Sequence, residues 1–124
     1  APSAPRPDGE LLWLHCPDAA SARAVAHLGQ RLATQRPGLT LLLTTSPGTK
    51  RPKDLPEALF WQECPSENPD DTRQFLDHWR PDAGLWIGPY LRPSLIEASV
   101  RRGIPVTLFD TGELLLENRL WRLG

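Results

Sequence analysis

Five short apolar runs, separated by more polar segments, constrain the fold of this chain most strongly. They are LLWLHC at 11–16, LTLLLTT at 39–45, ALFWQEC at 58–64, AGLWIG at 83–88 and PVTLFD at 105–110. A sheet with one face in water alternates apolar and polar residues, whereas parallel strands covered on both faces are continuously apolar. We therefore predict an α/β fold: a five-stranded parallel sheet with helices on both faces.

Helical signals occupy three of the segments between these runs. The first helix is expected over 18–36, with Asp18 as its N-cap and Pro37-Gly38 as its stop. Two more are expected over 70–79 and 93–102. The connection 46–56 is rich in Pro, Gly and Lys, so we expect a short or irregular crossover there. Right-handed crossovers then predict the strand order 3-2-1-4-5.

The two ends of the chain differ from its middle. The Pro-rich residues 1–9 predict a linker or disordered stretch, which leaves one domain over 10–124. The last segment, DTGELLLENRLWRLG, begins with a capping box of Asp110 and Glu113 and predicts a helix. Its apolar residues cover more than one stripe, so one sheet face cannot bury them all. We expect self-association of the isolated domain through Leu115, Leu116, Leu120 or Trp121.

Charge and cysteine content exclude several classes of protein. With 14 Lys+Arg against 15 Asp+Glu, the chain lacks the basic field that nucleic-acid binding requires. No apolar run reaches the roughly 18 residues of a membrane span, so we expect a soluble chain. Cys16 and Cys64 are too few for a disulfide scaffold, which favours a reducing compartment. In the order 3-2-1-4-5 they lie roughly 9 to 10 Å apart, too far for a bridge.

Candidate site residues lie in the loops after the strands, because an open parallel sheet binds ligands outside the carboxyl ends of its strands. Asp18 follows the first strand; it is a candidate acid or base, although an N-cap is the commoner role. His15 ends that strand, and a packed core histidine is there commoner than a catalyst.

Cations in two further loops are candidate contacts for an anion. The loop SPGTKRPK places Lys50, Arg51 and Lys53 on the ligand side, where charge-assisted hydrogen bonds could hold an anionic group. A solvated loop whose lysines aid solubility explains the same residues equally well. Arg92, at the start of the third helix, is the other candidate.

Cofactor sites are not expected. The first loop lacks GxGxxG, and SPGTKRPK is not GxxxxGK[ST], so dinucleotide and P-loop sites are rejected. His15, His27 and His78 fall on different elements without metal-ligand spacing. We therefore expect neither a cofactor nor a metal ion.

Several motifs in series resemble the N-terminal half of the Kdo transferases, glycosyltransferases that add 3-deoxy-D-manno-octulosonic acid to lipid A precursors. WLH at 13–15 matches that family's W-I-H strand end, and QRPGLTLLLTT at 35–45 resembles its helix followed by a strand ending in T-T. FLDHWRPD at 75–82 looks like its F-L-x-x-x-x-P-D. RPSLIEASVRRGIPVTLFD at 92–110 resembles its W-P-N-L-I, basic helix and G-I-P-V. The likeness covers nearly the whole chain from Leu11.

This resemblance implies the N-terminal half of a GT-B glycosyltransferase. Such enzymes pair a Rossmann-like, acceptor-binding N-terminal domain with a C-terminal domain that holds the donor, CMP-Kdo. The acceptor is a lipid-linked or anionic sugar. The resemblance also implies a cytoplasmic location, with the parent protein bound peripherally at the cytoplasmic face of the inner membrane. The donor domain is absent from this chain, so we expect no activity from the chain alone.

The resemblance weakens at the charged positions of the family's cleft. The family carries S-x-G-E after strand one, whose Glu acts as base on the acceptor hydroxyl, but this chain has Asp18-Ala19-Ala20-Ser21. Its E-x-E-x-W-P-N reads GPYLRPS at 88–94, and its N-x-R-L-S reads DTGEL at 110–114. Asp18 is therefore the nearest substitute for the base.

Three interpretations remain open. The chain is the acceptor domain of a divergent Kdo-transferase-like enzyme with a rewired base, or a non-catalytic relative that binds an anionic glycan or a protein. In the third, only the architecture is shared and the chain is an unrelated α/β module.

Overall fold

The structure is a computed structural model that describes residues 5–56, 59–87 and 93–109. Its elements follow one another as β1 (Leu11–Cys16), α1 (Ala19–Gln35), β2 (Thr40–Thr45), β3 (Phe60–Glu63), α2 (Pro69–Trp79), β4 (Ala83–Ile87), α3 (Pro93–Arg101) and β5 (Val106–Phe109). The five predicted strands and three predicted helices are all present, with shifts of one or two residues at some ends. The predicted C-terminal helix, with Asp110 and Glu113, lies outside the described residues.

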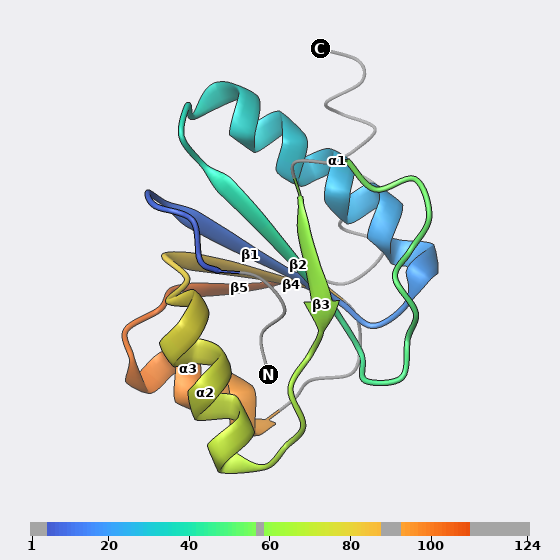
Figure 1. Ribbon diagram of the computed structural model, residues 1–124. Helices are drawn as coiled ribbons and strands as arrows, with labels where there is room; N and C mark the ends of the chain where they lie inside the picture. The colour runs from blue at the N-terminus through green and yellow to red at the C-terminus, as the bar shows by residue number, and fades with distance from the viewer. Residues whose placement is uncertain (1–4, 57–58, 88–92, 110–124) are drawn as a thin grey trace.

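The five strands form one parallel sheet in the order β3-β2-β1-β4-β5. Figure 1 shows α1 on one side of this sheet and α2 with α3 on the other. Both the parallel α/β architecture and the order 3-2-1-4-5 are thus confirmed. The chain moves outward from β1 to β3, crosses back to β4, and this reversal puts α2 and α3 on the opposite face from α1, as right-handed crossovers require.

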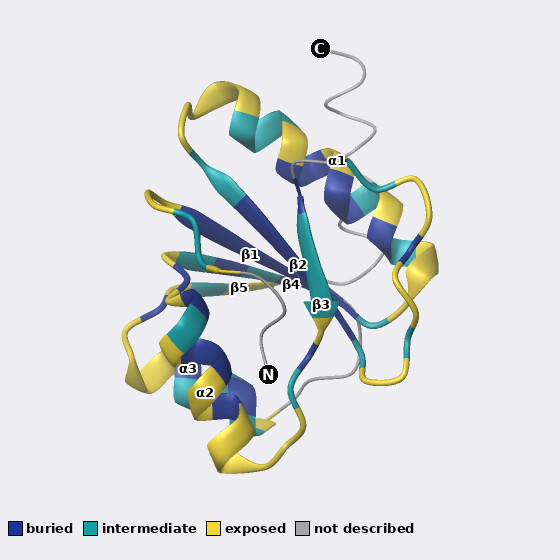
Figure 2. Cartoon of the chain, in the orientation of Figure 1, coloured by how far each residue is buried: buried dark blue, intermediate teal, exposed yellow. Residues whose placement is uncertain are grey.

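Side chains of β1 enter two separate cores because successive residues of a strand point to opposite faces. Leu12, Leu14 and Cys16 pack in the core under α1, while Leu11 and Trp13 pack in the core under α2 and α3. All six residues of β1 are buried, as a central strand covered on both faces demands. Figure 2 shows this burial concentrated in the central strands.

Helix ends agree with the local sequence signals. The Asp18 side chain accepts a hydrogen bond from the backbone amide of Ser21, which confirms the predicted N-cap of α1. Gly38 and Gly103 follow α1 and α3 with φ of +86° and +76°, conformations that glycine adopts without a Cβ clash. After α2 this role falls to Arg80, whose φ is 43°.

The connection between β2 and β3 contains no helix in its described part, 46–56 and 59, which agrees with the irregular crossover that we predicted. Asp54 in this connection accepts a hydrogen bond from Arg23 of α1 at 2.9 Å. The pair is largely exposed, so it orients the connection more than it stabilises the fold.

Residues 5–9 lie against the carboxyl end of α2. The Arg6 side chain is only 13% exposed, and its Nε donates to the Trp79 carbonyl oxygen at 2.6 Å. A second guanidinium nitrogen donates to the Arg80 carbonyl oxygen at 3.3 Å. Arg6 thereby binds carbonyl groups that the last turn of a helix leaves without partners.

Candidate functional site at the carboxyl edge of the sheet

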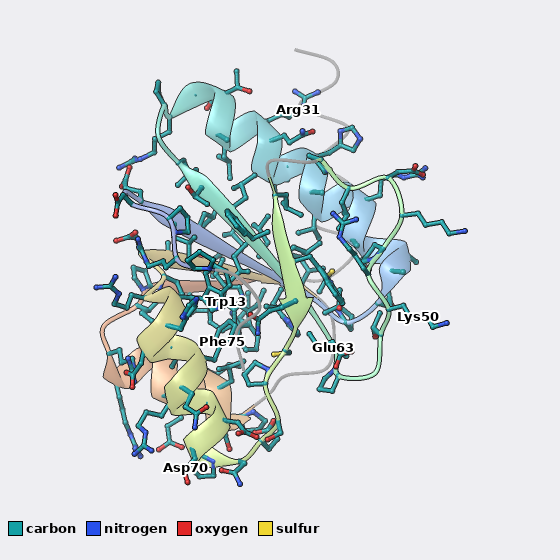
Figure 3. The ribbon with its side chains drawn as sticks, viewed as in Figure 1. Trp13, Arg31, Lys50, Glu63, Asp70 and Phe75 are labelled. Atoms are coloured by element: carbon teal, nitrogen blue, oxygen red, sulfur yellow. The ribbon has the colours of Figure 1, made fainter. Side chains whose placement is uncertain are left out.

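The loops at the carboxyl ends of β1, β2 and β3 bring the described candidate residues to one edge of the sheet. Asp18 follows β1, Lys50 lies in the loop after β2, and Glu63 ends β3. Figure 3 labels Lys50 and Glu63 at the same end of the molecule. Arg92, the remaining candidate, lies outside the described residues.

Asp18 is exposed, and its carboxylate is engaged in capping α1 through the 2.8 Å hydrogen bond from the Ser21 amide to Oδ1. The second carboxylate oxygen, Oδ2, is not used by that bond. Capping and proton transfer can use different oxygens of one carboxylate, so the cap does not prevent Asp18 from acting as a base. That role stays a prediction.

Three cations, Lys50, Arg51 and Lys53, are exposed in the loop after β2. Lys50 extends away from the sheet in Figure 3. Within the described part of the chain, none of the three forms an ion pair. Their arrangement can receive an anionic group, and this function stays a prediction.

Glu63 is a carboxylate of this edge that the sequence reasoning did not single out. It is exposed at the end of β3, and its Oε2 accepts a hydrogen bond from the Gly48 amide at 3.3 Å. This hydrogen bond connects β3 to the loop 46–53 that carries Lys50, Arg51 and Lys53, which we call the cationic loop. The only sequence signal was the position of Glu63 near the end of an apolar run, directly before Cys64-Pro65.

The helix N-termini at this edge bind side chains of the chain itself. Asp18 caps α1, Asn68 Oδ1 accepts from the Asp70 amide at the start of α2, and Glu67 Oε2 accepts from the Ser94 amide at the start of α3. Helix N-termini of open sheets often bind ligand anions through these same amides. These three amides are therefore already hydrogen-bonded within the chain, and an anion that approached them would compete with Asp18, Asn68 or Glu67.

His15 is a packed core residue, as the commoner of its two interpretations predicted. It is 1% exposed, its ring lies 4.8 Å from that of Trp86, and its Nδ1 is 2.8 Å from Thr44 Oγ1. Because the ring is buried, it cannot contact a ligand directly. His15 can affect the loops at the carboxyl edge of the sheet only through the residues that it contacts, such as Thr44 and Trp86.

Neither cysteine forms a disulfide, and both are buried: Cys16 ends β1, Cys64 directly follows β3, and β2 lies between these two strands. Burial, with a smaller contribution from the nearby charge of Asp18, raises the pKa of the Cys16 thiol to about 12. The thiol is therefore protonated at neutral pH and is a poor nucleophile.

Three of the grooves in the described part of the chain are lined in part by residues of α1. One, of ≈ 510 Å³, is at the opposite, amino edge of the sheet and is lined by apolar residues, such as Leu12 and Leu32, and by the charged residues Glu10, Arg36 and Asp82. Another, of ≈ 330 Å³, lies between Arg23 and His27 of α1 and the segment 54–56, next to the cationic loop.

Among the described residues, no cluster of three or more His, Cys, Asp or Glu side chains could hold a metal ion. Over the same residues, no helix is long and apolar enough to cross a membrane.

Comparison with known proteins identifies the family of this chain. The family model of 3-deoxy-D-manno-octulosonic-acid transferase (kdotransferase) matches residues 1–112. The chain belongs to this family. A probable mitochondrial 3-deoxy-D-manno-octulosonic acid transferase of Arabidopsis thaliana is 30% identical over 112 residues, which are 88% of this chain and 25% of that protein. The enzyme of that name from Rickettsia felis is 27% identical over 95 residues, 74% of this chain and 20% of that protein. The chain thus spans a quarter or less of the length of these relatives.

Solved structures support the fold. A ugt transferase from Siraitia grosvenorii, solved in complex with UDP, has a TM-score of 0.50 at 15% identity, over 82% of this chain and 24% of that one. A proposed Mar1 ribonuclease from Leishmania major has a TM-score of 0.54 at 18% identity, over 85% of this chain and 65% of that one. At such identities the likeness concerns the Rossmann-like architecture alone.

Proposed function

We propose that this chain is the acceptor-binding domain of a Kdo-transferase-like glycosyltransferase in lipopolysaccharide biosynthesis. The family match over residues 1–112 carries this proposal. The acceptor is a lipid-linked or anionic sugar, and the donor is CMP-Kdo held by a second domain. The place of action is the cytoplasm, at the cytoplasmic face of the inner membrane in the parent protein.

The carboxyl edge of the sheet supports this role. It carries the exposed cations Lys50, Arg51 and Lys53, which suit an anionic acceptor through charge-assisted hydrogen bonds. It also carries Asp18, a carboxylate directly after β1. Ligands of open parallel sheets bind at this edge, between loops of neighbouring strands.

The reaction needs one base on the acceptor side. As the acceptor hydroxyl oxygen bonds to the anomeric carbon of the donor, the base takes the hydroxyl proton and CMP leaves with the electrons of the broken bond. Asp18 is the proposed base, with Oδ2 as the receiving oxygen while Oδ1 caps α1. The cations orient the acceptor and lower the cost of bringing two anionic substrates together.

Calorimetry with this chain tests the proposal. We expect binding of a detergent-solubilised lipid A precursor and no micromolar binding of CMP-Kdo or CMP. The triple variant Lys50→Ala/Arg51→Ala/Lys53→Ala should weaken acceptor binding at least tenfold. The matched control, Arg36→Ala/Arg80→Ala/Arg101→Ala, removes three exposed cations from the opposite edge and should have little effect. Equal losses in the two triples, or tight binding of CMP-Kdo, would contradict the proposal.

A second candidate is a non-catalytic relative that binds an anionic glycan or a protein partner. It is favoured by one observation: Ser21 stands where the family's Glu is expected, and Asp18, the nearest carboxylate, already caps a helix. This alternative predicts acceptor binding without turnover even when the complete parent protein is assayed. Turnover by that protein would exclude it.

A further inference from the structure

A buried hydroxyl, that of Thr44, connects the ends of the central strands. Thr44 is fully buried, and its Oγ1 lies 2.8 Å from Trp13 Nε1 and 2.8 Å from His15 Nδ1. Trp13 and His15 belong to β1, whereas Thr44 belongs to β2. These two ring nitrogens are the hydrogen-bond partners that the structure places around the hydroxyl.

The direction of each hydrogen bond follows from the chemistry of the groups. The indole nitrogen can only donate, so Trp13 Nε1–H donates to Thr44 Oγ1. The hydroxyl proton then needs an acceptor, and His15 Nδ1 provides it only when Nδ1 carries no proton. With the proton on Nδ1, the buried hydroxyl hydrogen would have no acceptor among its two partners, which is costly. The arrangement therefore favours neutral His15 with its proton on Nε2.

The network occupies one level of the sheet, just below the candidate site. His15, Thr44 and Trp86 are each the next-to-last residue of β1, β2 and β4. The register aligns His15 with Thr44 on one side and with Trp86 on the other. The His15 ring, 4.8 Å from the Trp86 ring and hydrogen-bonded to Thr44, thus bridges three adjacent strand ends.

We propose that Thr44 holds His15 as the neutral Nε2–H tautomer, and that His15 in this form is a positioning residue for the loops after β1 and β2. Those loops carry Asp18 and Lys50. The ring fixes how far apart these strand ends lie and how they are turned. The consequence for acceptor binding rests on the proposed function, whereas the tautomer and the loop positions do not.

The tautomer can be measured without a variant. Long-range ¹H–¹⁵N spectra of the histidine rings at pH 7.5 should show His15 protonated at Nε2 only, with exposed His27 as an internal reference. Thr44→Ser keeps the hydroxyl and should keep this pattern. Thr44→Val keeps the shape and removes the hydroxyl, so it should give a mixture of tautomers. Wild-type protein with the proton on Nδ1 would overturn the proposal.

Loop positions and acceptor affinity form the second test. In Thr44→Val, amide shifts of residues 17–21 and 46–50 should move, while Thr44→Ser and the control Thr40→Val, at the other end of β2, should leave them in place. Acceptor affinity should fall at least about fivefold in Thr44→Val, because displaced loops would no longer align Asp18 and Lys50 with the acceptor, and stay within twofold in the other two. Unmoved loops in Thr44→Val would refute the positioning role.

The two proposals fail in different ways. If wild-type protein binds no acceptor, the proposed function is wrong, while the tautomer and the amide shifts still decide the role of Thr44 and His15. If Thr44→Val unfolds, the wild-type tautomer and the Thr44→Ser spectra decide it. Thr44→Ser with altered tautomer or shifted loops would also count against the proposal.

Discussion

The carboxylate of Asp18 accepts a hydrogen bond of 2.8 Å from the backbone amide of Ser21, three residues further along the chain. This bond satisfies one of the four amides that the first turn of α1 leaves without partners. Asp18→Ala should therefore lower the free energy of unfolding by about 1 kcal/mol, whereas Asp18→Asn should change it by a few tenths, because Asn caps helices as well as Asp does. Urea unfolding measures both.

The same pair of variants separates the cap from the proposed base. In the complete parent protein, Asp18→Asn keeps the helix cap but removes the base, so turnover should fall by about two orders of magnitude or more. Circular dichroism checks that the fold is retained. Turnover close to the wild-type value would leave Asp18 with the capping role alone.

Arg6 should contribute measurably to stability although it lies in the stretch that was predicted to be a linker. Its guanidinium binds the carbonyl oxygens of Trp79 and Arg80 and is mostly buried. Arg6→Ala should lower the unfolding free energy by about 1.5 to 3 kcal/mol, the range for hydrogen bonds to charged groups. Arg73→Ala, which removes an exposed pair with Asp70, is the control and should cost under about 1 kcal/mol. Equal losses in the two variants would show that the buried contacts of Arg6 stabilise the protein no more than an exposed ion pair does.

Gly29 marks the closest approach of α1 to the sheet. A Cβ atom there would lie 2.7 Å from Leu14 Cδ1 and 3.2 Å from Leu41 Cδ1. Gly29→Val should destabilise the protein by about 1 to 3 kcal/mol through overpacking, despite the poor helix propensity of glycine. Gln30→Val, at the next and exposed position, should change stability little, and thermal unfolding compares the two. A stabilised Gly29→Val protein would mean that the leucines move aside freely.

Cys16 should resist alkylation in the native state. Because burial raises the pKa of its thiol from 9.0 to about 12, the thiol stays protonated across the usual range of assay pH. In a Cys64→Ser variant, iodoacetamide should label Cys16 slowly at pH 8 and rapidly after unfolding in urea. Because the pKa of Cys16 is higher in the folded state than in the unfolded state, its protonated thiol favours folding fully below about pH 9. This contribution to the free energy of unfolding is lost as the pH rises toward 12. Native labelling as fast as that of the unfolded chain would contradict this pKa.

The isolated domain should self-associate through its last residues, Leu115, Leu116, Leu120 or Trp121, which lie outside the described part of the chain. At about 25 cal/mol per Å², a few hundred Å² of apolar surface favours association by several kcal/mol before the entropy of binding is subtracted. Sedimentation at micromolar to millimolar concentration should show dimers or larger species, and Leu120→Glu should shift them to monomer. Leu108→Glu, on the 51% exposed side chain of β5, is the control. A wild-type monomer at millimolar concentration would refute the prediction.

Local signals predicted the elements and their order correctly. The run LLWLHC gave the bounds of β1 without error, and Asp18 was recognised as the N-cap of α1 because a cap and its amide lie three residues apart. Strand order also followed from sequence, since short right-handed crossovers leave few topologies for five parallel strands. Of the site, the sequence indicated which loops to inspect.

Contacts between distant residues were decided by the tertiary structure alone. Thr44 is 29 residues from His15, Arg6 is 73 residues from Trp79, and Glu67 is 27 residues from Ser94. Helix periodicity and caps are encoded within three or four residues, so they can be read from the sequence. Hydrogen-bond partners across strands depend on register and on how side chains fill the core, which no local pattern specifies. For this reason the sequence determined the strands that carry His15 and Thr44, and only the packed sheet joined the two side chains.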